Sequence, residues 1–77
     1  MEHEINFIND YSYILSRVQI DEICVLSESL DESCYTVDTN GTIHLNLRAC
    51  PVEFIVQVYT IFKNRLHYLS HPIVRNN

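Results

Sequence analysis

The sequence has one glycine and two prolines among its 77 residues and contains no tryptophan. With Gly41 alone, the chain cannot form the glycine-rich loops that cradle phosphates or dinucleotides, so those nucleotide-binding motifs are excluded. No serine stands in the G-x-S-x-G pattern of a nucleophile elbow. The adjacent acids Asp21-Glu22 and Asp31-Glu32 point apart on a helix, which argues against a shared acid–base site. We therefore predict that the protein is not an enzyme.

Metal ligands at useful spacing are also scarce. His67 and His71 stand four residues apart, but no Glu lies between them and no third ligand follows, so the H-E-x-x-H zinc pattern is absent. The stretch D-T-N-G-T resembles part of a calcium loop with Gly41 at its sixth position, yet Leu47 then occupies the place of the bidentate Glu. We expect neither a metal nor a cofactor.

Long hydrophobic runs are missing, and no stretch approaches the roughly 18 apolar residues of a membrane span. The acidic start MEHEINF differs from the basic start of a signal peptide. The three cysteines (Cys24, Cys34 and Cys50) cannot all pair with one another, so free and mostly buried thiols are expected. Cys50 precedes Pro51 at a predicted helix start, where the helix dipole can lower a thiol pKa, but a buried cap is favoured. We predict a cytoplasmic protein, in the host cell if a phage encodes it.

The apolar content is high for so short a chain. Hydrophobic residues make up 47% of the sequence, which favours one compact domain over residues 1–77. A chain of this size buries only about 60% of its unfolded surface. Surplus apolar surface therefore favours self-association.

Basic residues are few and unevenly placed. Residues 1–38 hold nine acids against Arg17 alone, whereas residues 39–77 hold one acid against four bases, and the net charge is −5. Such a division predicts one acidic surface and another mildly basic one.

The stretch from Cys34 to Leu47 predicts a β-hairpin. A three-residue loop, Thr39-Asn40-Gly41, pairs Val37 with Ile43 and Tyr35 with Leu45. In this register one face of the hairpin is apolar, whereas a two-residue Asn-Gly turn mixes apolar and polar residues on both faces. We expect strands at about 34–38 and 42–47, joined by a type I turn with a bulge at Gly41.

The rest of the chain predicts helices. Apolar residues recur with helical spacing over about 10–30, with Asn9 or Asp10 as a cap, which favours one long helix. A break near 19–21, with a third strand at 22–27, is the alternative. A second helix follows Pro51 and ends at Pro72. Its main apolar stripe contains Val52, Ile55, Val58, Tyr59, Phe62, Leu66 and Leu69. The predicted fold is a small α+β domain of α-β-β-α order.

The last helix carries a second apolar stripe. Phe54, Ile61 and Tyr68 lie seven residues apart, away from the main stripe. We predict that they form a homodimer interface, because one stripe suffices to pack on the hairpin and the other helix. A core that surrounds more of this helix is the alternative.

The charge pattern suggests a protein partner. Asp21, Glu28, Asp31 and Glu32 are predicted to bind a partner with a basic surface, which is typical of proteins that handle nucleic acids. An inhibitor or regulator of such a protein, of the anti-defence type made by phages or mobile elements, is the favoured function. One alternative is a dimeric nucleic-acid-binding regulator that uses the basic C-terminal helix; another is an obligate or chaperone-like subunit of a larger complex. The basic residues in question are Lys63, Arg65, His67, His71 and Arg75.

Overall fold

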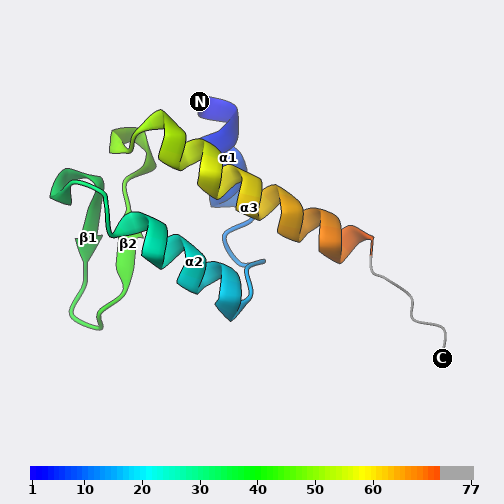
Figure 1. Cartoon of the computed structure of the whole chain (residues 1–77), viewed down its shortest axis with the longest axis horizontal. Helices are drawn as coiled ribbons and strands as arrows, with labels where there is room; N and C mark the ends of the chain where they lie inside the picture. The colour runs from blue at the N-terminus through cyan, green and yellow to red at the C-terminus, as the bar shows by residue number, and fades with distance from the viewer. Residues whose placement is uncertain (72–77) are drawn as a thin grey trace.

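A computed structural model describes residues 1–71 and shows a small mixed α+β fold with three helices and a two-stranded antiparallel hairpin (Figure 1). The elements in order are α1 (Glu2–Asp10), α2 (Arg17–Ser27), the 3₁₀ turn η1 (Glu32–Cys34), β1 (Tyr35–Val37), β2 (Ile43–Leu45), the 3₁₀ turn η2 (Leu47–Ala49) and α3 (Val52–Ser70). The molecule measures 49 × 28 × 20 Å, and α3 runs along much of its length. Within residues 1–71, no helix is both long enough and apolar enough to cross a membrane.

The predicted single helix over 10–30 is wrong, because α1 ends at Asp10 and α2 covers only Arg17–Ser27 of that range. Residues 11–16 separate α1 from α2, so the break lies before the expected position at 19–21. Asn9 and Asp10 end α1 and do not cap a following helix. Both residue types are weak helix formers, and an acid at a helix C-terminus is disfavoured by the helix dipole. The alternative of a third strand at 22–27 is also wrong, since α2 covers those residues.

A capping box starts α2. The Ser16 backbone N–H donates to the side-chain oxygen of Gln19 at 2.9 Å, and the Ser16 hydroxyl contacts the same oxygen. This pair satisfies a backbone donor that the first turn of a helix leaves without a partner. The S-x-x-Q spacing therefore sets where the chain re-enters a helix.

The hairpin has the predicted register. Tyr35 pairs with Leu45 and Val37 with Ile43. Gly41 has a φ of +80°, in the left-handed region that glycine enters without steric cost. The Asp38 carbonyl accepts from the Gly41 N–H at 3.0 Å. The strands are shorter than expected, because η1 and η2 take up the ends assigned to 34 and 47.

The apolar face of the hairpin is only partly covered. Leu47 is buried, Tyr35 and Leu45 are half-buried, and Val37 and Ile43 are exposed near the turn. The end of the hairpin next to η1 and η2 therefore packs on the core, while the turn end projects away from it.

The core forms where α1, η1, η2 and α3 meet. Its buried apolar side chains are Ile5, Ile8, Ile14, Cys34, Leu47, Cys50, Phe54, Ile55, Val58 and Phe62. On α3 this includes three members of the predicted main stripe, whereas Val52 and Leu69 are exposed. The last helical residue is Ser70, and Pro72, the predicted helix terminator, lies outside the described residues. No apolar side chain of α2 is fully buried.

Candidate protein-binding surface

The four predicted partner-binding acids are all exposed. Asp21 lies on α2 and forms an ion pair with Arg17 one turn earlier, at 3.1 Å. Glu28 is the C-terminal cap of α2, and Asp31 and Glu32 begin η1. The Asp31 carboxylate accepts from the Glu32 N–H at 2.9 Å, which fixes the start of this turn. Three of the four acids thus lie within five residues of one another.

Those three carboxylates lie at one end of the molecule. The end of α2 and the segment leading to β1 are far from the C-terminal end of α3 along the long axis (Figure 1). Among residues 1–71, none of Glu28, Asp31 and Glu32 forms an ion pair. The C-terminus of α2 adds the partial negative charge of a helix end. Negative potential is therefore concentrated at this end, which we call the acidic end.

The basic side chains of α3 lie toward the other end and contact aromatic rings. Lys63 lies 5.3 Å from the centre of the Tyr59 ring, and Arg65 lies 5.3 Å from that of Tyr68. Arg65 also donates to the backbone oxygen of Ile14 at 3.0 Å, which ties the loop before α2 to α3. Arg75, part of the predicted basic cluster, lies outside the described residues.

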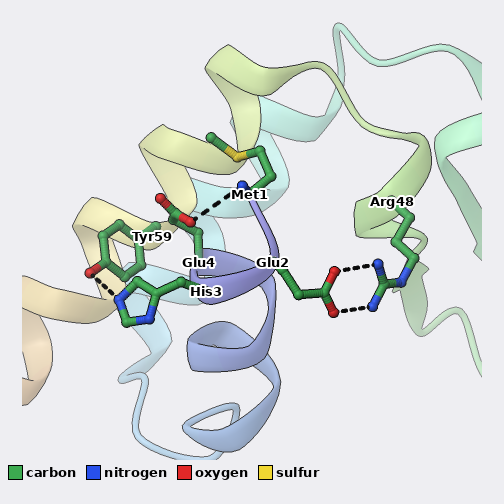
Figure 2. Close-up of polar contacts among 6 residues, drawn as sticks. All are labelled: Met1, Glu2, His3, Glu4, Arg48 and Tyr59. Carbon is green, nitrogen blue, oxygen red and sulfur yellow. Dashed lines mark hydrogen bonds and ion pairs between the residues drawn. The ribbon is translucent and has the colours of Figure 1, made fainter.

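A second group of polar contacts holds α1 in place (Figure 2). Arg48 in η2 donates both terminal nitrogens to the Glu2 carboxylate, at 2.6 and 2.5 Å. These hydrogen bonds lower the pKa of Glu2. The His3 ring lies 3.3 Å from the Tyr59 hydroxyl. Both contacts join the first residues of the chain to its second half.

The structure divides the three predicted dimer-interface residues. Phe54 is only 5% exposed and packs in the core of this single chain, so it offers a partner no surface. Ile61 is half-buried, and Tyr68 is 55% exposed. Ile61 and Tyr68 share a cavity of about 400 Å³ between α2 and α3. Its other lining residues are Gln19, Glu22, Asn64 and Arg65. The expected second stripe therefore reduces to its C-terminal two members.

A larger hollow lies between α2 and the hairpin, with a volume of about 420 Å³. We call it the α2 groove. Isoleucine, leucine, valine and phenylalanine supply most of its lining. The residues are Ile8, Asn9, Ser12, Leu15, Ile20, Ile23, Cys24, Ser27, Ile43, His44, Leu45, Leu47, Val58 and Phe62.

The sequence did not reveal the α2 groove, because it assigned Ile23 and its neighbours to a packed stripe of one long helix. The Ser16-x-x-Gln19 pattern was the available signal, since it marks the start of a separate helix.

The cysteines and histidines lie in different surroundings. Burial, reinforced by the neighbouring Cys34, raises the pKa of the Cys50 thiol to about 11, so this thiol stays protonated and weakly nucleophilic at neutral pH. Cys34 is buried as expected, whereas Cys24 is exposed. The rings of His67 and His71 stack at 4.4 Å. Across the described part of the chain, no three metal-ligating side chains gather.

Comparison with known proteins gave no further guide. No family model, no curated protein and no solved structure matches this chain.

Proposed function

We propose that the protein is a small, non-enzymatic binding module that covers a basic surface of another protein. The favoured role is that of an inhibitor or regulator of a protein that handles nucleic acids, of the phage or mobile-element anti-defence type. The observation that carries the proposal is the acidic end, where Glu28, Asp31 and Glu32 are exposed and have no ion-pair partner within residues 1–71. Three free thiols suit a reducing cytoplasm.

Electrostatics explains how such a module would act. Exposed carboxylates at one end steer the molecule toward positive potential and raise the rate of encounter. Proteins that bind nucleic acids present clustered Lys and Arg side chains to phosphates. A protein that occupies such a cluster competes directly with the nucleic acid for the same charges.

Two variants with equal charge change test the acidic end. Glu28→Gln/Asp31→Asn/Glu32→Gln removes its carboxylates, and Asp10→Asn/Glu22→Gln/Glu53→Gln removes three exposed carboxylates elsewhere. Each protein is immobilised and exposed to an extract of the source organism at rising salt. The unaltered protein should retain one dominant basic protein, which the first variant loses and the control keeps. Equal retention by both variants, or retention of nothing by the unaltered chain, would contradict the proposal.

The regulatory part of the proposal needs a second measurement. The captured protein is purified, and its affinity for nucleic acid is measured with and without the acidic module. Occupied basic side chains should lower that affinity, and the effect should weaken as salt screens the charges. An unchanged affinity would show that the module binds elsewhere.

We also propose a homodimer formed through Ile61 and Tyr68. Tyr68 is exposed and Ile61 lies beside it in the cavity between α2 and α3, so both can contact a second copy. Light scattering should give twice the monomer mass, and Ile61→Glu should halve it. Val56→Glu, at an exposed position elsewhere on α3, serves as the control. A monomeric unaltered protein would refute the dimer.

A further inference from the structure

The α2 groove is lined by α2 and β2 and also by the end of α1 and the loop after it, through Ile8, Asn9, Ser12 and Leu15. One wall is a single face of α2, formed by Ile20, Ile23, Cys24 and Ser27. These residues are spaced i, i+3, i+4 and i+7, so they form a continuous helical stripe. The opposite wall is β2, with Ile43, His44 and Leu45. Val58 and Phe62 of α3 also line the groove, where they join the core to it.

Apolar side chains on both walls reach solvent. Ile20 is 45% exposed on α2 and Ile43 is 40% exposed on β2. The groove is therefore open along its edge, between a helix and a strand whose apolar faces are not covered by any of residues 1–71. A cover that buried both isoleucines would gain hydrophobic free energy in proportion to the area removed from water.

The volume fits several side chains. About 420 Å³ is close to three times the roughly 150 Å³ of an apolar cavity that binds one benzene molecule. An amphipathic helix offers three such anchors on one face, at i, i+3 or i+4, and i+7. The groove has room for more than one such anchor.

The charges beside the groove define the chemistry of the occupant. Asp21 and Glu28 follow the groove-lining Ile20 and Ser27 by one residue, so both acids lie on the same side of α2, seven residues apart. Among the described residues that line the groove there is no Lys or Arg. His44, on the other wall, lies 3.0 Å from the Asp38 carboxylate. Asp21 is already paired with Arg17, so Glu28, at the acidic end, is the carboxylate beside the groove that positive side chains of an incoming segment would meet.

We infer that the α2 groove binds an amphipathic helix of the partner protein, with apolar anchors in the groove and Lys or Arg residues near Glu28 at the end of α2. The inference rests on the proposed function and specifies the form of the partner. The acidic end steers the encounter, and the groove holds the complex together by burying apolar surface.

Synthetic peptides of about 16 residues test the groove directly. The first carries Leu at i, i+4 and i+7 with Lys beside them on a helix-forming background. The second has the same composition in an order that breaks the helical spacing, and the third has Glu in place of Lys. The first should bind at least about tenfold more tightly than either of the others, as measured by NMR chemical-shift changes. Equal binding of the first two would show non-specific apolar contact and would overturn the inference.

Two positions on α2 provide a matched pair of variants. Ile20→Ser alters the groove wall and should weaken binding of the first peptide by about tenfold or more. Val18→Ser alters a side chain that is 72% exposed and does not line the groove, so it should leave binding unchanged. Ile43→Thr on the opposite wall repeats the test if Ile20→Ser fails to fold. If Val18→Ser and Ile20→Ser weakened peptide binding equally, the groove would not be the binding site.

The same variants separate this inference from the proposed function. In one outcome, a basic partner is captured by the unaltered protein and by Ile20→Ser but lost with Glu28→Gln/Asp31→Asn/Glu32→Gln. This result would support the proposed function and contradict the inference that the groove binds the partner. Alternatively, Ile20→Ser abolishes binding of the first peptide, and the unaltered protein retains no partner from the extract. This result would support a peptide-binding groove and contradict the proposed function. A change of oligomeric state on Ile20→Ser would assign the groove to a second copy of this chain and overturn the inference.

Discussion

The two short helices α1 and α2 are similar in length, with 9 and 11 residues, yet they relate to the core in different ways. α1 buries Ile5 and Ile8 against the long helix α3. α2 buries only Ser27, whose hydroxyl donates to the Cys24 carbonyl of its own helix at 2.7 Å. The first helix is part of the core, and the second covers the core incompletely.

The polar contacts of α1 reach distant parts of the chain, whereas the ion pair of α2 is local. α1 is joined to distant residues by Glu2 with Arg48 and by His3 with Tyr59 (Figure 2). The ion pair of α2, Arg17 with Asp21, lies within one turn of that helix. A local pair stabilises the helix but does not fix its position relative to the rest of the chain.

The largest expected difference concerns buried side chains. Ile5→Ala should lower the free energy of unfolding by roughly 2–5 kcal/mol, because it removes buried methyl groups and leaves a cavity in the core. Val25→Ala, on the exposed side of α2, should change it by no more than about 0.5 kcal/mol. Urea unfolding measures both, and Ile5→Val provides a milder variant if Ile5→Ala does not fold. Equal losses would show that the two helices are equally packed.

Hydrogen exchange should reveal the same contrast without mutation. Amides of α2 should exchange on the order of tenfold faster than those of α1 and of α3 near Val58, because a segment with few buried apolar contacts opens locally. NMR or mass spectrometry gives the rates by segment. Protection of α2 equal to that of α3 would mean that it unfolds only with the whole molecule.

The capping box should matter locally. Ser16→Ala removes the hydroxyl at the start of α2 and should cost about 1 kcal/mol. The loss should appear as weaker helical chemical shifts at Arg17–Ser27, with α1 unaffected. Ser12→Ala, at an exposed serine outside the helices, is the control. A loss spread over the whole core would indicate that α2 is an integral part of it.

The smallest expected effect concerns the Glu2–Arg48 pair. The pKa of Glu2 is lowered from its ordinary 4.5, so the pair stabilises the fold above the unfolded-state pKa. This contribution is lost as the pH falls through the lower folded-state pKa. Arg48→Ala should return the pKa of Glu2 toward 4.5, as followed by carboxyl NMR shifts. A pKa of Glu2 that does not change on this substitution would show that the contact is weak in solution.

Local patterns in the sequence were sufficient for the hairpin. Side chains alternate between the faces of a strand, so only one register placed Val37 opposite Ile43 on an apolar face. The single glycine then fell at the one described position with positive φ. The helical spacing of Ile55, Val58 and Phe62 also identified the buried side of α3. Each of these features depends on neighbours in sequence, which a pattern can show.

Contacts between distant segments decided the rest. Phe54 was assigned to an outer stripe, but it is buried because the core surrounds more of α3 than one stripe. The spacing of residues 2–10 did not predict that Ile5 and Ile8 would join the core, because their burial depends on α1 packing against α3. The α2 groove likewise exists only through the angle between a helix, a strand and α3. Sequence spacing determines which side chains share a face, and tertiary packing determines which of those faces remain open to a partner.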